Sequence, residues 1–248
     1  MTTVTAGMAE AGTRAAIRPR VRSRFYVGLS ALMAGIVVVG FWPSYFGPML
    51  IGRIARPALI QAHGIVFVGW MVLLMAQVIL AARGEVALHR RIGRYGIGYG
   101  WLVLVMGVVV GPAAAAMHVR ANEWPIDRAA GFLLVTFGDM VLFGGCFIAA
   151  VAYRSRPEIH KRLMVSATVA LLFAAVGRMA FIQSQLLFAA VWLSPLLAGM
   201  AHDWLTRRRV HPVYMIATAG LCLGALRLLI AESELWLRIG RPLIRALL

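Results

Sequence analysis

The sequence predicts an all-α polytopic membrane protein, built as a bundle of seven transmembrane helices. Of its 248 residues, 61% are hydrophobic and 14% are charged, whereas a soluble domain carries about a quarter charged residues. Several apolar runs are about 20 residues long, the length at which a helix crosses the hydrocarbon core of a bilayer. Basic residues gather in the short segments between these runs, as they do beside membrane helices.

The seven expected spans form one transmembrane domain, residues 25–231. Residues 1–24 are rich in Thr, Ala and Arg, which is typical of a disordered basic tail. The apolar run after this tail is too long for a signal peptide and has no A-x-A cleavage site behind it, so we expect an anchor helix. The spans are expected at 25–42, 58–81, 95–117, 130–153, 163–182, 185–203 and 212–231.

Two of these regions have a pattern of their own. In residues 232–248, arginines recur at helical spacing, so we expect an amphipathic segment in the plane of the membrane interface. In the third span, small residues recur at a spacing that lets neighbouring helices pack closely. The arginines are Arg238, Arg241 and Arg245, and the small residues are Gly96, Gly100, Gly107 and Gly111.

The basic residues also predict the orientation of the chain, because cytoplasmic loops carry an excess of Lys and Arg. A cytoplasmic N-terminus and an outside C-terminus put most of them on the inner side. The inner segments then hold Arg14, Arg18, Arg20, Arg22, Arg24, Arg83, Arg90, Arg91, Arg94, Arg154, Arg156, Lys161, Arg162, Arg207, Arg208 and Arg209. The outer segments hold Arg53, Arg56, Arg120, Arg128, Arg238, Arg241 and Arg245. The sequence thus predicts a multi-pass protein of the bacterial inner membrane, with the lipid bilayer as its surroundings.

Composition excludes several functions. The net charge of +16 suggests nucleic-acid binding, but it is spread over short loops and no groove-reading motif is present, so we expect no nucleic-acid partner. The only lysine, Lys161, is expected in a loop, which excludes a retinal Schiff base within a membrane helix. The two cysteines, Cys146 and Cys222, lie in different apolar runs and form no CxxC motif.

Three connections share one layout, in which a histidine stands beside arginines just before an outgoing span. They are Leu88-His89-Arg90-Arg91, Ile159-His160-Lys161-Arg162 and Arg208-Arg209-Val210-His211. Histidine is the commonest metal ligand in proteins, so the inner side is a candidate for a metal site. Its members are His89, His160, His202, Asp203 and His211. The alternative is that basic loops merely happen to include histidine.

Four ionisable residues are expected within the spans, in the outer third of the bilayer, where such groups are costly and usually functional. They are His63, Asp139, Arg178 and Arg227. Asp139 can pair with one arginine, which lowers the cost of burying both. We therefore expect a polar pocket suited to a small anionic or carbonyl-bearing molecule. Two alternatives stay open: these residues only tie the helices together, or Arg227 extends to the membrane surface.

Four segments, AHGIVFVGW, ALHRRIGRYG, RPEIHKRLM and HDWLTRRRVHP, resemble an uncharacterised family of bacterial seven-helix inner-membrane proteins over residues 57–212. The resemblance implies a fold and a location but no reaction. The residues that match its pattern are His63, Trp70, Gln77, His89, Arg90, Gly93, His160, Lys161, Arg162, Arg178, Asp203 and His211. The chain is more loosely similar to di-haem b-type membrane cytochromes, which place paired histidines near each membrane face. That likeness implies haem ligands among His63 and His118 on one side, and His89 and His160 on the other.

Three functions follow as hypotheses. The first is binding of a small molecule or cofactor between helices, with haem b and electron transfer as its sharpest form. The second is a metal-dependent intramembrane hydrolase that uses His and Asp ligands. The third is a transporter or accessory subunit without a cofactor, in which the buried Arg and Asp residues form a polar path. The sequence contains no Ser-His-Asp arrangement, P-loop or HExxH motif, and it predicts neither the catalytic residues nor the oligomeric state.

Overall fold

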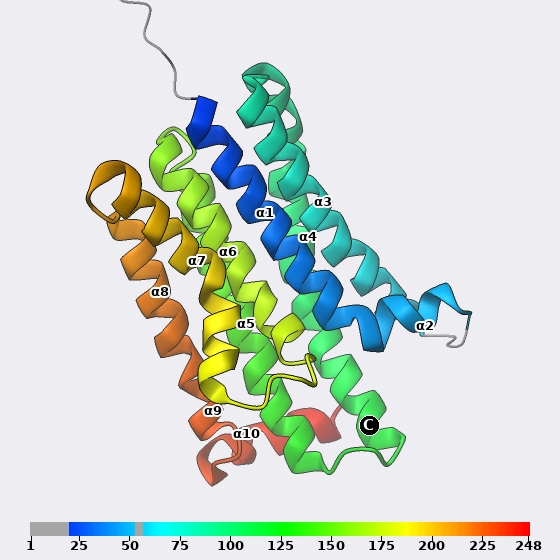
Figure 1. Ribbon diagram of the computed structural model, residues 1–248. Helices are drawn as coiled ribbons and strands as arrows, with labels where there is room; N and C mark the ends of the chain where they lie inside the picture. Colours follow the sequence, from blue (N-terminus) through cyan, green and yellow to red (C-terminus); the bar gives the residue numbers. More distant parts are fainter. Residues whose placement is uncertain (1–19, 53–56) are drawn as a thin grey trace, which may run out of the picture.

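The computed structural model confirms the all-α membrane fold (Figure 1). It describes residues 20–52 and 57–248, and within these ranges every regular element is helical. Seven helices in this part of the chain are long and apolar enough to cross a membrane. Most of the expected N-terminal tail, residues 1–19, lies outside the described residues. Helix α1 already begins at Arg20, so the end of that expected tail is helical.

The first span is composite. Helix α1 (Arg20–Phe41) runs through one π-helical turn, η1 (Trp42–Phe46), into the short α2 (Gly47–Leu50). The next five spans are single helices: α3 (Ala58–Arg83), α4 (Val86–Arg120), α5 (Ile126–Ala152), α6 (Pro157–Val176) and α7 (Gln185–Arg207). The seventh span begins with α8 (Pro212–Ala225). The turn-length α9 (Arg227–Ile230) completes the seventh span, and the amphipathic α10 (Glu234–Arg245) follows it.

The three histidine-bearing turns lie at one end of the bundle, beside the start of α1 (Figure 1). We call this the hairpin end, and the opposite end, where α10 lies, the far end. Helix α3 ends in the left-handed Gly84 (φ 82°), a conformation that glycine adopts without steric cost, and α4 begins two residues later. Helix α6 begins at Pro157, whose missing N–H is not needed in a first helical turn.

Helices α4 and α6 differ most from the bounds expected. Helix α4 starts at Val86 rather than 95, and α6 covers 157–176 rather than 163–182. Both start before the apolar run does, because their first turns contain charged residues that a hydropathy pattern assigns to loops. As a consequence, His89 and His160 lie within helices, each as the fourth residue. Arg178, expected within the fifth span, lies just after α6.

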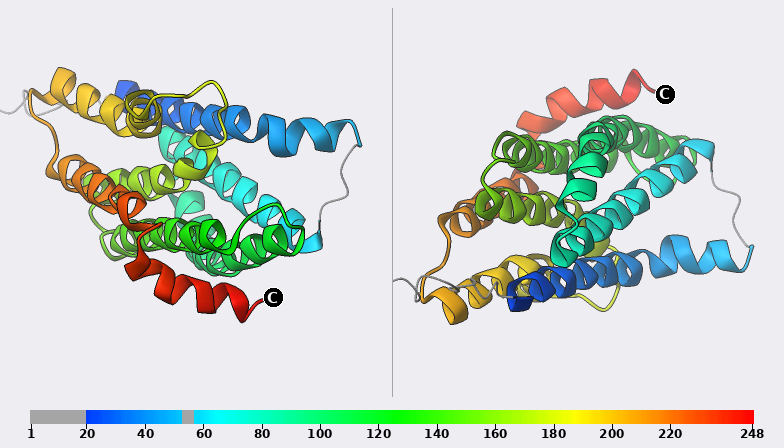
Figure 2. Two further views of the ribbon diagram at one scale, coloured as in Figure 1. Left: turned by 90° about the horizontal axis from the view of Figure 1, so that it is seen from below. Right: turned by 90° about the horizontal axis from the view of Figure 1, so that it is seen from above.

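The bundle has two apolar cores. The larger one runs along the middle of the bundle and draws on α1 and α3 to α8. Helix α5 packs against α4, α6 and α10, and α6 packs against α1, α7 and α8. The smaller core is at the far end, where Leu237 and Ile244 of α10 cover Ala115, Ala129 and Leu133. Figure 2 shows α10 on the outer side of the bundle, next to α5.

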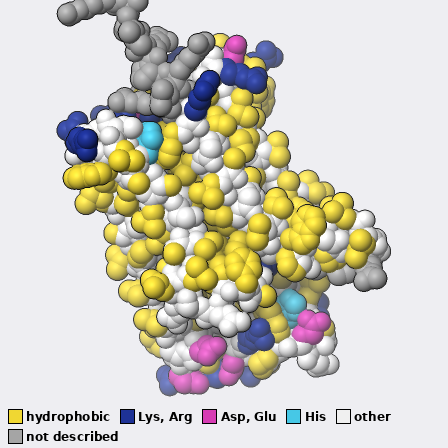
Figure 3. Space-filling model, viewed as in Figure 1, with side chains coloured by type: hydrophobic (Ala, Val, Ile, Leu, Met, Phe, Trp, Pro, Cys, Tyr) yellow, Lys and Arg dark blue, Asp and Glu magenta, His cyan; other side chains and the backbone are white. Residues whose placement is uncertain are grey.

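The surface has the banded pattern of a membrane protein. Lys and Arg side chains gather at the hairpin end, both acidic and basic side chains lie at the far end, and a hydrophobic band separates them (Figure 3). Large apolar residues of the band point outward, among them Ile65, Val141 and Ile216. In water such exposure would be costly, so this band is the surface that lipid covers.

Candidate functional site

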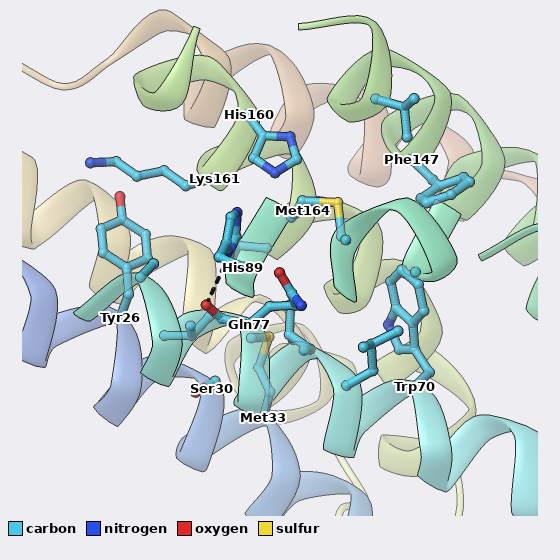
Figure 4. Close-up of a pocket in the computed structure, with 18 of the residues that line it drawn as sticks. Tyr26, Ser30, Met33, Trp70, Gln77, His89, Phe147, His160, Lys161 and Met164 are labelled. Atoms are coloured by element: carbon cyan, nitrogen blue, oxygen red, sulfur yellow. Dashed lines mark hydrogen bonds between the residues drawn. The ribbon is translucent and has the colours of Figure 1, made fainter. Parts of the chain in front are cut away.

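A cavity of about 390 Å³ lies at the hairpin end, between α1, α3, α4, α5 and α6 (Figure 4). Its volume is within the range of small-molecule sites in proteins. Polar side chains line the part near the turns, and apolar ones line the deeper part. The polar ones are Tyr26, Ser30, Gln77, His89, Glu158, His160 and Lys161, and the apolar ones include Met33, Trp70, Leu74 and Phe147.

Two histidines enter this cavity from neighbouring helices, His89 from α4 and His160 from α6 (Figure 4). Nδ1 of His89 lies 3.2 Å from the carbonyl oxygen of Gln77, and Nδ1 of His160 lies 2.7 Å from that of Ala150. A carbonyl oxygen only accepts hydrogen bonds, so both Nδ1 atoms must carry the proton and donate it. In the neutral form, each ring then has an unprotonated Nε2, the atom with which histidine binds metals or accepts hydrogen bonds.

The floor of the cavity is a rigid aromatic group on α3 and α5. The indole Nε1–H of Trp70 donates a hydrogen bond to the hydroxyl of Thr168 on α6, at 3.2 Å. The Trp70 ring meets Phe143 and Phe147 edge-on, with centroid separations of 5.3 and 5.8 Å. This hydrogen bond joins α3 to α6 at the apolar part of the cavity, opposite the polar part at the hairpin end.

One buried polar atom in the cavity has no partner. Nε2 of Gln77 is enclosed and makes no hydrogen bond to any described residue. An unpaired buried donor costs about 1–3 kcal/mol, so an acceptor on a bound molecule would relieve this cost. Beside it, α4 presents Gly93 and Gly96 to the cavity. An added Cβ at Gly93 or Gly96 would make ordinary van der Waals contacts with side chains of α3, at 3.6 and 3.4 Å, so glycine leaves the space of one methyl group at each position.

A cluster of charges stands at the mouth of the cavity. Glu158 accepts hydrogen bonds from Lys161 (2.7 Å), Arg162 (2.9 Å) and Arg207. Arg162 also donates to both carboxylate oxygens of Asp203 on α7, at 2.6 and 3.1 Å, and its guanidinium lies over the Tyr214 ring. The side chains of Arg162 and Asp203 are each 1% exposed. This buried network joins α6, α7 and α8 next to the site.

The candidate metal ligands of the inner side do not form a common site. His89 and His160 share the cavity, whereas Asp203 pairs with Arg162. His202 stacks on Phe25 with ring centroids 3.9 Å apart. Nδ1 of His211 accepts a hydrogen bond from the backbone of Val213 and caps α8. Among the described residues, no three His, Cys, Asp or Glu side chains are close enough to hold a metal ion.

The four residues of the expected outer pocket separate into two places. Asp139 on α5 forms a buried ion pair with Arg227, which also donates to the carbonyl oxygen of Gly224 at 2.7 Å. Arg178 lies over the ring of Phe41 and within electrostatic reach of His63. Arg227 therefore turns inward rather than to the membrane surface, since only 8% of its side chain is exposed.

His63 and His118, expected as haem ligands on one side, lie at different depths. They are on α3 and α4, on either side of the turn at Gly84 and Glu85. His118 is about 12 residues further from that turn than His63, or roughly 18 Å along the bundle. His118 pairs with Glu123 at 2.5 Å and stacks on Trp124, whereas His63 packs on Phe67. Of the two expected histidine pairs, only His89 and His160 share a cavity.

Sequence reasoning missed Arg162, which was assigned to a topology-setting loop together with Lys161. The available signal was Glu158, because Glu and Arg four residues apart pair on one helix face, as they do here. A helix start at Pro157 would have placed this pair on α6.

Similarity to known proteins adds no further information about the site. No protein-family model, no curated protein and no solved structure matches the chain.

Proposed function

We propose that the protein binds a b-type haem in the cavity at the hairpin end, that His89 and His160 are the residues that would hold its iron, and that it serves membrane electron transfer. The observation that carries the proposal is the pair of imidazoles in one cavity, each fixed by an Nδ1–H bond to a backbone carbonyl. Metal-ligating histidines are typically held in this way, because the bond fixes the tautomer and the ring orientation.

The surroundings of the two histidines fit a flat apolar group with polar edges. Trp70, Leu74 and Phe147 offer an apolar floor, and Gly96 leaves room beside α4. The ligation would be non-covalent, since neither cysteine of the chain belongs to a CxxCH attachment motif. When bound, haem b supplies one-electron transfer, and the protein contributes orientation and the apolar enclosure that sets its potential.

A visible spectrum tests this proposal. The protein is expressed with a haem supply, purified in detergent and measured in oxidised and reduced states. We expect a Soret band and the spectrum of a low-spin, bis-histidine haem. The variants H89A and H160A are expected to lose that band, because each removes one of the two imidazoles that would hold the haem.

The matched control is H118A, which removes a histidine of α4 that lies outside the cavity. It is expected to keep the band, and a thermal melt checks that all three variants fold. A colourless wild-type protein after haem-replete expression would overturn the proposal. So would a band that H89A and H160A retain at wild-type intensity.

A second candidate ligand is an amphipathic carbonyl compound of the quinone class. The unpaired Nε2 of Gln77 favours it, since this amide N–H could donate a hydrogen bond to a carbonyl oxygen of the ring. This reading predicts a colourless protein from which organic solvent extracts a quinone. The variant Q77L is expected to reduce the extracted amount, and its failure to do so would count against this candidate.

The other two hypotheses have less support. A metal-dependent hydrolase needs three protein ligands around the metal, and the described residues offer no such group. A transporter would use the Asp139–Arg227 pair as part of a polar path, yet both side chains are satisfied by each other within the bundle. Loss of substrate flux in D139A or R178A remains the test of that reading.

We further propose that the chain lies in a bacterial inner membrane with its hairpin end in the cytoplasm, as a member of the uncharacterised seven-helix family. The excess of basic residues at the hairpin turns supports the orientation. Single cysteines at Arg209 and Glu123, in a chain with Cys146 and Cys222 replaced, test it. An impermeant thiol reagent applied to intact cells should label only the cysteine at position 123.

A further inference from the structure

We infer that Lys161 holds an anionic group of the cavity's ligand at the hairpin end, and that Glu158 competes with this group for the lysine. For a haem, the group is a propionate. This inference rests on the proposed function, because it names the polar anchor of the same site. It also gives a role to Lys161, whose positive charge was otherwise explained by membrane topology alone.

The first argument is charge balance at the mouth of the cavity. Three cations, Lys161, Arg162 and Arg207, share the two carboxylates of Glu158 and Asp203. One positive charge is therefore in excess within this cluster. Arg162 is fully committed, since it lies buried between both carboxylates. Of the three cations, Lys161 is the one that lines the cavity, so it is the one that can offer positive charge to a ligand.

The second argument is hydrogen-bonding capacity. An ammonium group has three N–H donors, and Lys161 donates one hydrogen bond to another described side chain, that of Glu158. Two donors are left for an acceptor on the ligand. The ammonium lies 4.9 Å from the centroid of the Tyr26 ring, a cation–π contact that keeps it beside the cavity rather than extended into the loop region.

The third argument is the direction of the cavity. Figure 4 shows Lys161 and Tyr26 on one side of the two histidines, and Trp70 and Phe147 on the other. A ligand with an apolar body and a charged edge lowers its free energy only when the edge points to the lysine, because a carboxylate at the aromatic floor would be buried without a partner. The site therefore fixes which end of an amphipathic ligand enters first.

Two forms of one probe test the inference. Protein prepared without haem is titrated with haem and with haem dimethyl ester, whose propionates carry no charge, and the shift of the Soret band gives both affinities. We expect the wild-type protein to bind haem about tenfold more tightly than the diester, the ratio for one charge-assisted hydrogen bond. In K161Q, the two compounds are expected to bind equally, through a loss of haem affinity alone.

The variant E158Q has the opposite expected effect, since removal of the competing carboxylate raises the preference for haem over the diester. Each result is a ratio of two affinities on one protein, so a general loss of stability cancels. The control R91Q removes an exposed arginine of α4 outside the cavity and should leave the ratio unchanged.

The outcomes separate the two proposals. No Soret shift with either compound overturns the haem proposal and this inference with it. Equal binding of haem and diester by the wild-type protein overturns only the inference. The same holds if K161Q weakens both compounds equally, which would mark a purely structural lysine.

Discussion

Arg162 of α6 and Asp203 of α7 form a two-pronged ion pair, with Nη2 to Oδ1 at 2.6 Å and Nε to Oδ2 at 3.1 Å. Both side chains are buried, although they lie near the hairpin end of the bundle. Asp203 also accepts a hydrogen bond from the backbone N–H of His211, at 3.2 Å. One carboxylate thus fixes the start of α6, the end of α7 and the turn before α8.

Loss of one partner of this pair should be more harmful than loss of both. R162M leaves Asp203 buried without its main partner, and we expect a loss of about 3–5 kcal/mol in the free energy of unfolding. The double variant R162M/D203L removes both charges and is expected to recover a large part of that loss. Thermal unfolding in detergent measures both. Equal destabilisation in the single and double variants would contradict a mutual pair.

Acid should weaken the start of α8. Burial and the positive charge of Arg162 lower the pKa of His211 from its ordinary 6.5. The unfolded chain therefore binds the proton first, and this part of the stability, present above about pH 6.5, is lost as the pH falls from that value through the lower pKa of the folded protein. Protonation also removes the Nδ1 lone pair that accepts the N–H of Val213.

The measurement is the thermal midpoint between pH 8 and pH 5, with H211N as the control. Asparagine can still cap the helix but does not titrate, so the variant should lose less stability on acidification, by about 1 kcal/mol, the typical contribution of a cap. Parallel pH curves for the two proteins would show that His211 is not responsible.

Close contact between α4 and α5 should make one glycine indispensable and another dispensable. A Cβ at Gly100 would collide with the ring of Phe147, whereas a Cβ at Gly98 meets nothing within 4 Å. We expect G100A to cost about 1–3 kcal/mol through overpacking. The control G98A should be neutral or slightly stabilising, since alanine favours a helix more than glycine does. Similar melting temperatures for the two variants would refute the contact.

The floor of the cavity should depend on one hydroxyl. T168V keeps the size of Thr168 but removes the acceptor of the Trp70 N–H bond. An unsatisfied buried indole N–H is expected to cost about 1–3 kcal/mol. T168S retains the hydroxyl and serves as the control. Both are compared by thermal unfolding, and an unchanged midpoint in T168V would mean that the Trp70 ring packing alone fixes the floor.

The seven spans could be predicted because lipid imposes long apolar runs, which are visible without any tertiary information. The small-residue pattern of the third span likewise predicted close packing, and Gly100, Gly107 and Gly111 do face side chains of α5. Helix starts could not be predicted as well. The first turns of α4 and α6 are polar, so hydropathy alone placed His89 and His160 in loops, whereas both lie in helices and line the cavity.

The grouping of ionisable residues was predicted only by depth. The expected depth in the bilayer grouped four residues, His63, Asp139, Arg178 and Arg227. Depth along a span contains no information about which helix faces meet. The structure pairs Asp139 with Arg227 because α5 packs against α8 and α9, whereas Arg178 follows α6 and lies on Phe41 of α1. Helix adjacency is a property of the folded bundle, and a single sequence does not reveal it.

The smaller core at the far end has a consequence for the order of folding. This core is covered by α10, which is synthesised only after all seven spans. Until Leu237 and Ile244 leave the ribosome, the alanines of α4 and α5 at that end lack the cover that α10 provides. The hairpin end can therefore assemble during membrane insertion, whereas the opposite end is completed only when α10 packs onto it.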